Sequence, residues 1–294
     1  PSIGESLERA DVVLSAKAFV QAASEDSRAR GIQPGSYRMP MRISAKEALN
    51  VLVDPANRSG VIVIPEGTRA SRVAQIASEA SGIPEAEFLA VMENPTALGL
   101  PSYANGKVEG FLFPATYDVG PNPTPTKLLA DMVTKFKQVA ASMELERRAA
   151  AVGQSPHGIV TIASIIQAEG RTLEEYGKIS RVIYNRLACT LPACKADHIN
   201  QRLQMDSTIN YAQGTSELDL TMEQLRKDGP YNTHINKGLP PTPIGNPGEE
   251  ALEAALEPTP GSWLYFISAP GFSQFSDTFA QHQEAEKKWR AGRE

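Results

Sequence analysis

The alternation of apolar and polar residues predicts a mainly helical chain. Apolar side chains recur three or four positions apart over 126–150, 156–169 and 173–187, the spacing of helices that bury one face. Two of these segments carry start signals. Ser155 is followed by a proline suited to the first helical position, and Thr172 opens a capping box with a glutamate three residues on. We therefore expect these two helices to begin at well-defined residues.

Shorter elements follow in the carboxyl-terminal part. Residues 263–275 hold two strand-like runs around a Pro-Gly pair, which predicts a β-hairpin. A terminal helix is expected from about Asp277, and a short helix over 207–212. The segment 228–246 is rich in proline, glycine and asparagine and too long for an ordinary connection. We interpret it as a loop that lines a cleft.

The amino-terminal part contains a faint repeat. The pattern predicts two short helices at residues 3–10 and 12–19. A second pair is predicted at residues 73–80 and 82–88. Only the second copy follows a strand, at 61–64, so we expect the chain to begin inside the first unit. Further extended structure is expected at 35–37 and 108–117, with a domain boundary between residues 105 and 125.

Composition narrows the class of protein. The 294 residues are 41% hydrophobic and 21% charged, with a net charge of −5, which suits a globular protein with a real core. No lysine or arginine run exceeds a pair, so nothing indicates nucleic-acid binding. No apolar stretch approaches ~18 residues. The sequence itself therefore predicts no membrane span.

Two cysteines, Cys189 and Cys194, lie close together in a proline-containing segment. A local disulfide is the natural interpretation in an oxidising compartment. Free thiols remain an alternative. A zinc site is the weakest one, because His198 is the only further ligand nearby and four are needed.

Glu169 is the most informative single residue. Ile162, Ile165 and Ile166 precede it by seven, four and three positions, so all four share one helical face. Burial raises the pKa of a carboxyl group toward neutrality, which a general acid requires. The alternative is a glutamate at a frayed helix end that simply reaches water. Spacing alone does not decide between them.

Several ordered segments resemble one family, the endolytic murein transglycosylases, also called YceG-like. The resemblance extends from about residue 35 onward, and its strength lies in the order of the segments rather than in any one of them. The segments are Pro65–Thr68, Glu109–Tyr117, Ala163–Glu169, Asn185–Leu187, Leu203–Asp206, Tyr231–Thr233, Gly238–Ile244, Asn246–Gly248 and Leu264–Phe266.

This resemblance implies an α+β fold. It would comprise a LysM-like amino-terminal region over 1–108, whose first unit is truncated, and a mainly helical catalytic domain over 109–294 that ends in a β-hairpin. Members of the family act outside the cell membrane, to which an amino-terminal helix, absent from this sequence, anchors them. They cleave nascent peptidoglycan strands internally and leave 1,6-anhydro-N-acetylmuramyl ends. The implied partners are glycan strands and cell-wall synthases, with no cofactor, metal or nucleic acid.

The essential glutamate of the family lies in the segment matched by Ala163–Glu169. Some members have two glutamates there, but the first position is Gln167 here, so Glu169 is the expected acid and base. Amide, hydroxyl and carboxylate groups suited to sugars are our substrate-binding candidates. They are Asn185, Gln204, Asp206, Tyr231, Asn232 and Thr233.

Some of these polar residues could have structural roles instead of binding or catalytic ones. Asp206 fits the N-cap of the helix at 207–212, and Asn246 fits the cap of a helix near 249. His157, His198, His234 and His282 are scattered and show no triad or metal spacing. The 188–202 stretch is longer than the family pattern and is expected to alter the groove rim.

Two other functions fit the same residues. A hydrolytic muramidase would use Glu169 and Asp206 together, and would leave reducing ends instead of anhydro ends. A non-catalytic glycan-binding scaffold of the cell-wall machinery would need no acid at all. Product analysis separates the first from a transglycosylase, and substitution of Glu169 separates the second.

Overall fold

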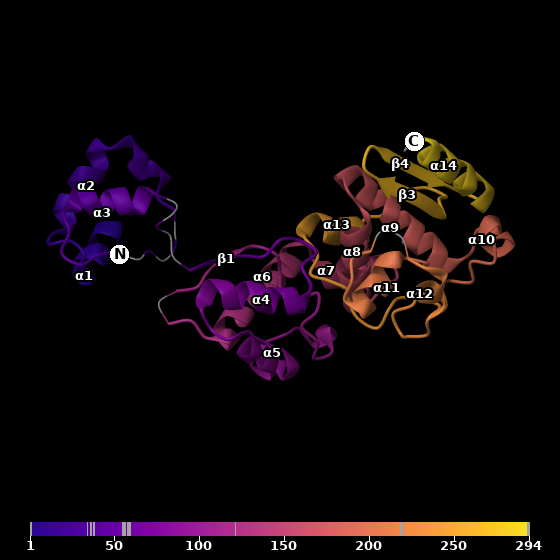
Figure 1. Cartoon of the computed structure of the whole chain (residues 1–294), viewed down its shortest axis with the longest axis horizontal. Coiled ribbons are helices and arrows are strands. Elements are labelled where there is room, and N and C mark those ends of the chain that lie inside the picture. Colours follow the sequence, from indigo (N-terminus) through magenta and orange to yellow (C-terminus); the bar gives the residue numbers. More distant parts are fainter. Residues whose placement is uncertain are drawn as a thin grey trace.

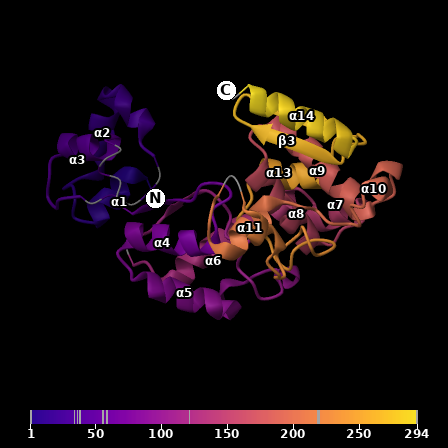
Figure 2. The same cartoon turned by 45° about the vertical axis from the view of Figure 1, so that its right-hand side comes forward.

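The computed structural model describes residues 2–33, 35, 37, 39–54, 57, 60–120, 122–217 and 220–292. Helices dominate, and the described residues contain two small antiparallel sheets, the second of which is a carboxyl-terminal hairpin. The predicted α+β class is therefore confirmed. Three lobes follow one another along the chain (Figures 1 and 2).

The first lobe is a small helical unit with its own core. Its elements are α1 (Ile3–Arg9), α2 (Ala16–Glu25), the 3₁₀ helix η1 (Ser27–Gly31) and α3 (Ala45–Val53). Phe19 and Leu49 lie at the centre of its buried cluster. The strand start expected at 35–37 includes Ser36, which lies outside the described residues.

The second lobe repeats the pair of short helices. Its elements are β1 (Val61–Val63), α4 (Ala70–Ser81), α5 (Glu85–Glu93), η3 (Pro95–Leu98), η4 (Ser102–Ala104) and β2 (Thr116–Asp118). Strands β1 and β2 pair antiparallel, with Ile62 opposite Tyr117. Each predicted helix pair is present, although α2 begins later than expected because Ser15 caps it. The likeness of this region to LysM remains a prediction.

The prediction of extended structure at 108–117 is wrong over most of that segment. Only residues 116–118 form a strand, and the preceding residues form turns. The Leu112 N–H donates 2.8 Å to Oδ1 of Asn246 instead of to a neighbouring strand. Gly110 has a φ of 91°, and a Cβ there would fall 2.5 Å from the ring of Pro243. A contact distant in sequence therefore decides this local conformation.

The third lobe holds most of the helices and the hairpin. Its elements are α7 (Leu145–Ala151), α8 (Pro156–Glu169), α9 (Leu173–Ala188), α10 (Pro192–Ala196), α11 (Asp206–Gln213), α12 (Met222–Arg226), α13 (Glu249–Leu256), β3 (Tyr265–Ala269), β4 (Phe272–Ser276) and α14 (Phe279–Ala291). Helix α6 (Pro125–Ser142) packs mainly on the second lobe, against α5 and η3, and joins two cores, because Met132 packs in the second lobe and Phe136 in the third. The domain division at residue 108 stays a prediction.

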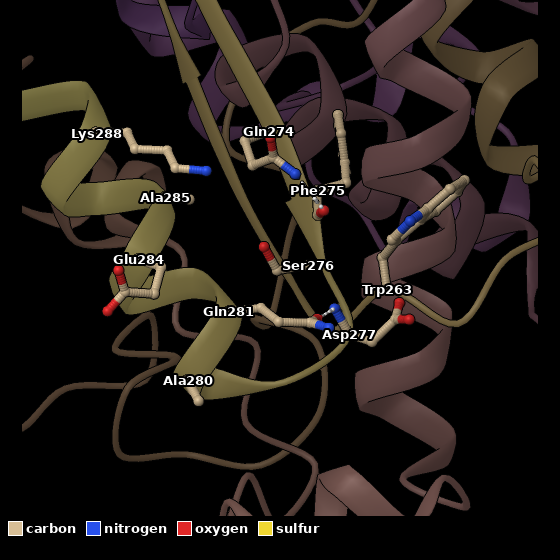
Figure 3. A pocket seen from close by; sticks show the side chains of 10 residues that line it. All are labelled: Trp263, Gln274, Phe275, Ser276, Asp277, Ala280, Gln281, Glu284, Ala285 and Lys288. Carbon is tan, nitrogen blue, oxygen red and sulfur yellow. Dashed lines mark hydrogen bonds between the residues drawn. The ribbon is translucent and has the colours of Figure 1, made fainter. Parts of the chain in front are cut away.

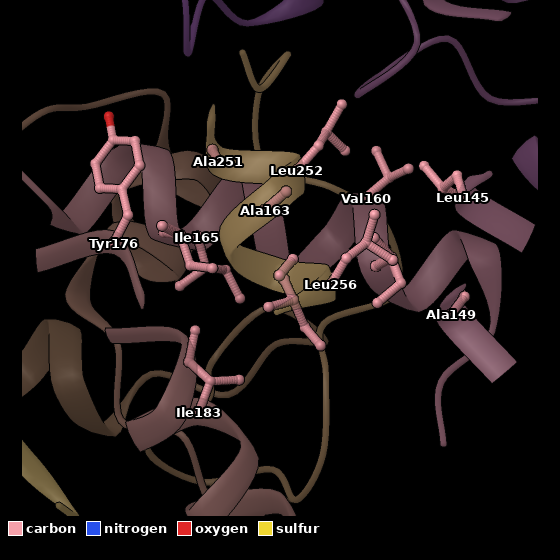
Figure 4. Packing of buried hydrophobic residues seen from close by; sticks show 14 of the residues in the cluster. Leu145, Ala149, Val160, Ala163, Ile165, Tyr176, Ile183, Ala251, Leu252 and Leu256 are labelled. Atoms are coloured by element: carbon pink, nitrogen blue, oxygen red, sulfur yellow. The ribbon is translucent and has the colours of Figure 1, made fainter. Parts of the chain in front are cut away.

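Helix α8 forms the centre of the third lobe. It is buried on all sides from Gly158 to Ile166, and α13 packs along it through Leu252 and Leu256 (Figure 4). Each such buried aliphatic side chain contributes roughly 1.5–3 kcal/mol. Among the described helices none is by itself long and apolar enough to cross a membrane. The pair α7 and α8, bent by 87°, meets that criterion only when combined.

A disulfide joins Cys189 to Cys194 and links the end of α9 to α10. Of the three interpretations of these cysteines, the structure supports the disulfide. Cys194 is fully buried against Leu264 and Tyr265 below the hairpin. Just beyond it, Asp197 accepts hydrogen bonds from the Tyr265 hydroxyl at 3.0 Å and from the backbone of α14 at 2.9 Å. The disulfide loop therefore fastens the hairpin and the last helix to α9.

Candidate active site

Helix α8 carries Glu169 as its last residue. The Ser155 hydroxyl accepts the Gly158 N–H at 3.0 Å, Pro156 occupies the first helical position, and the helix ends at Gly170. Ile162, Ile165 and Ile166 are fully buried, whereas Glu169 retains partial exposure. The apolar face thus holds the helix in the core while its final carboxylate reaches a cleft.

The cleft has a volume of about 420 Å³ and lies between the end of α8, the start of α11, the hairpin and α14. Its lining joins three carboxylates, one arginine and two histidines from distant parts of the sequence. The lining residues are Glu169, Val182, Arg186, Leu203, Gln204, Met205, Asp206, His234, Leu264, Tyr265, Phe266, Ile267, Ser268, Phe279, His282 and Glu286.

Burial raises the pKa of Glu169 above its usual range. The neighbouring negative charge of Asp206 raises it further, while His234 and the Ser207 N–H, which donates to Oε1 at 3.3 Å, oppose the shift. The Ser207 hydroxyl also faces this carboxylate, although its oxygen forms no hydrogen bond of normal geometry. Desolvation is the dominant cause, so this acid favours its neutral form.

Asp206 lies beside Glu169 in a different environment. It is the first residue of α11, and the N-cap is Met205, so the expected N-cap role of Asp206 is wrong. Its Oδ1 lies 2.8 Å from Nε2 of His234. The start of α11 and the histidine both present N–H groups near this side chain. The cleft therefore pairs a desolvated carboxyl group with a more exposed one that contacts a histidine.

The 228–246 loop contributes to the cleft through His234. Its neighbour Thr233 is buried and accepts the Gln204 and Met205 N–H groups, each at 3.0 Å, through its carbonyl and hydroxyl oxygens respectively. Asn232 accepts the His234 N–H at 2.9 Å and donates to the carbonyls of Leu225 and Lys227 at the end of α12. Thr233 and Asn232 thus position the chain next to the cleft instead of lining it.

Arg186 is 5% exposed and approaches the cleft from α9. Its guanidinium donates to the carbonyls of Leu203 and Leu264 and, at 2.7 Å, to Oε1 of Gln204. Burial lowers its pKa to about 10, so it stays charged at neutral pH. Carbonyl and amide oxygens, not a carboxylate, accept the hydrogen bonds of this guanidinium group. Its bond to Oε1 orients Gln204 in the cleft.

Two other substrate-binding candidates do not line the cleft. Asn185 donates to the carbonyls of Gly261 and Trp263 and fastens the approach to the hairpin. The hydroxyl of Tyr231 lies 2.7 Å from that of Thr242. Of the six candidates, the structure places Gln204 and Asp206 beside Glu169. The roles of all six in binding remain predictions.

The expected helix-cap role of Asn246 is wrong. Gly248 is the N-cap of α13, and Asn246 is fully buried between two lobes. Besides its bond from Leu112, it donates 2.7 Å to the Thr68 carbonyl. The turn at residues 65–68 is thereby fastened to the third lobe.

A second hollow, of about 570 Å³, lies between β4 and another side of α14 (Figure 3). Trp263 and Phe275 border it, but its chemistry differs from that of the first cleft. Glu284 is exposed, and the Lys287 ammonium at 2.6 Å lowers the pKa of that carboxyl. Such a carboxylate is not suited to donate a proton. The larger hollow is therefore not the candidate active site.

Metal-ligating side chains are not clustered within the part of the chain that the structure describes. No group of three His, Cys, Asp or Glu side chains there could hold an ion. The titratable cleft residues that sequence reasoning missed are His234, His282 and Glu286. The one available signal was the position of His234 inside the loop already expected to line a cleft.

Comparison with known proteins gives this geometry a context. Residues 1–288 match the YceG-like family. The chain belongs to this family. The fold agrees with a crystal structure described as a yceG-like protein from Listeria monocytogenes, at 27% identity and a TM-score of 0.68, over 96% of this chain and 94% of that one.

Two relatives of this YceG-like chain carry the name endolytic murein transglycosylase. The Bacillus subtilis protein is 28% identical over 98% of this chain and 81% of its own length. A Streptococcus pneumoniae protein is 26% identical over 90% of this chain. The chain spans 52% of the length of that second relative.

Proposed function

We propose that this YceG-like chain is an endolytic murein transglycosylase and that Glu169 is its general acid and base. Relatives of that name match nearly the whole chain, which supports peptidoglycan as substrate. The observation that carries the assignment of Glu169 is its environment. The cleft brings the carboxyl group of Glu169, whose pKa desolvation raises, next to a second carboxyl group, Asp206, which contacts His234 at 2.8 Å. Two carboxyl groups held in different environments in this way suit acid–base chemistry.

The reaction follows from one carboxyl group used twice. Neutral Glu169 donates its proton to the oxygen between N-acetylmuramic acid and N-acetylglucosamine, and the bond from that oxygen to C1 breaks. The charged Glu169 then removes the proton from the C6 hydroxyl of the muramyl sugar. That oxygen bonds to C1 and closes the 1,6-anhydro ring, so Glu169 regains its proton and no water is consumed. The attack benefits from its intramolecular geometry.

The second candidate function is a hydrolytic muramidase. Asp206 lies in the same cleft as Glu169, and a pair of carboxylates is the usual equipment of glycoside hydrolysis. The two functions differ in product: the transglycosylase leaves an anhydro end, whereas the muramidase adds water and leaves a reducing end.

Digestion of uncrosslinked peptidoglycan by wild type and Glu169→Gln, with end groups identified by mass spectrometry, tests the proposal. We expect anhydro ends from wild type and no cleavage by the variant. Because burial raises the pKa of Glu169 and therefore costs stability once the unfolded chain ionises, the variant should unfold at the same or a higher urea concentration than wild type, which serves as the folding control. Reducing ends would support the muramidase, and cleavage by Glu169→Gln would overturn the role of this residue.

The place of action follows from the same proposal. Peptidoglycan lies outside the cell membrane, and the Cys189–Cys194 disulfide suits an oxidising compartment. We therefore propose extracytoplasmic action on glycan strands. Anchoring in the membrane and partnership with cell-wall synthases are predictions from the family resemblance alone.

A further inference from the structure

The pair formed by His234 and Asp206 has no part in the two-step use of Glu169. The carboxylate accepts from Nε2 at 2.8 Å, and an ionised carboxylate can only accept, so Nε2 carries the hydrogen. The imidazole side chain is 22% exposed and the Asp206 side chain 46% exposed. The histidine is thus mostly enclosed, while the aspartate extends into the cleft.

The backbone on both sides of this pair is fixed. Thr233 binds the N–H groups of Gln204 and Met205, so the segments that carry the histidine and the aspartate are fastened together one residue before each side chain. Asn232 then holds the His234 N–H. A contact supported in this way keeps its geometry before substrate binds, which is the condition for electrostatic preorganisation.

The reaction creates a need for a fixed negative charge. Breaking the glycosidic bond leaves positive charge on C1 and the ring oxygen of the muramyl sugar. Glu169 cannot stabilise that charge while it is neutral, and after proton transfer it must act as a base. Besides Glu169, the cleft lining contains Asp206 and Glu286, and Asp206 directly precedes Ser207, whose N–H binds Glu169. Its position in the first turn of α11 places this carboxylate at the positive end of the helix dipole.

We propose that His234 is a positioning residue for transglycosylation: it orients Asp206 so that this carboxylate stabilises the positive charge that develops on the muramyl sugar. This inference rests on the proposed function. It separates the duties of the two carboxylates, with Glu169 moving protons and Asp206 remaining charged throughout. It also predicts that His234 acts only through Asp206.

The kinetic test compares His234→Phe, which cannot donate, with His234→Gln, whose amide N–H can. We expect His234→Phe to lower kcat by about 10- to 100-fold, with KM changed by less than about threefold because binding contacts remain. We expect His234→Gln to recover most of that loss. In an Asp206→Asn background, His234→Phe should produce no further loss, because coupled residues are not additive. His198→Asn, an exposed histidine change outside the cleft, is the matched control.

Nitrogen-15 NMR of the imidazoles gives a readout that does not depend on activity. In wild type we expect neutral His234 to carry its proton on Nε2, and in Asp206→Asn we expect that preference to be lost. An unchanged kcat for His234→Phe, an additional loss in the Asp206→Asn background, or an Nδ1 proton in wild type would each overturn the positioning role. If wild type cleaves no glycan, the proposed function fails, whereas the NMR result still decides whether the pair exists.

Discussion

The hydroxyl of Tyr211 donates a 3.0 Å hydrogen bond to Oε2 of Glu109 and so connects α11 to the second lobe. The other oxygen of Glu109 accepts the N–H of Ala70, the first residue of α4, at 2.9 Å. Glu109 is 9% exposed, and burial raises its pKa to about 7. The helix that begins with Asp206 is therefore fixed at its far end by a second desolvated carboxyl group.

This environment predicts that Glu109 makes stability depend on pH. Below pH 4.5 the carboxyl is neutral in both states, and between 4.5 and about 7 it ionises only in the unfolded chain. Unfolding then releases a proton, so stability falls as pH rises through this window. The shift from 4.5 to about 7 corresponds to about 3 kcal/mol. Glu109→Gln removes this loss, so its stability relative to wild type should rise between pH 4 and pH 8.

Urea unfolding of both proteins at pH 4 and pH 8 measures this effect. Glu223→Gln, an exposed change in α12, is the matched control and should show a much smaller pH-dependent difference. Equal differences for the two variants would contradict the role of Glu109.

The raised pKa of Glu169 predicts the alkaline limit of activity. Because the neutral form donates the first proton, the rate should fall as pH rises through that pKa. In Asp206→Asn the neighbouring negative charge is gone, so the pKa of Glu169 falls and the alkaline limb of residual activity moves to lower pH. Asp228→Asn, exposed in the adjoining loop, should leave the profile in place. A limb that stays fixed in Asp206→Asn would argue against the coupling of these carboxylates.

Removal of the Asn246 side-chain amide should cause a large loss of stability. Asn246→Ala leaves the buried Leu112 N–H without its partner, while the Thr68 carbonyl loses the side-chain bond but keeps the bond from the backbone N–H of residue 246. One unsatisfied buried group costs about 2 kcal/mol. Asn236→Ala, an exposed asparagine that bonds one loop carbonyl, should change stability by less than about 0.5 kcal/mol. Urea denaturation measures both, and similar small losses would exclude a joining role for Asn246.

The disulfide should stabilise the protein measurably although its loop is short. Constraint of the unfolded chain by a loop of this size contributes about 2 kcal/mol. The double change Cys189→Ser with Cys194→Ser should therefore lower the urea midpoint, and reductant should lower that of wild type by a similar amount. Reductant should not affect the double variant, which is the control. No response of wild type to reductant would contradict a stabilising disulfide.

The sequence determined the helices that present the site. Ser155 and Thr172 start α8 and α9 at the predicted residues, and the isoleucines of α8 are buried as their spacing requires. Capping and amphipathic periodicity act over a few neighbouring residues. For this reason they can be read without knowledge of the fold.

Only the tertiary structure decided which side chains meet. Asp206 and Asn246 looked like helix caps because both residue types favour that position, yet distant partners hold them. Ser207 lies 38 residues from Glu169, and His234 lies 28 residues from Asp206. Such contacts depend on how α8, α11 and the following loop pack together, which local spacing does not encode. The sequence therefore placed the acid at the end of a buried helix, and packing supplied the desolvation and the neighbouring charges that set its chemistry.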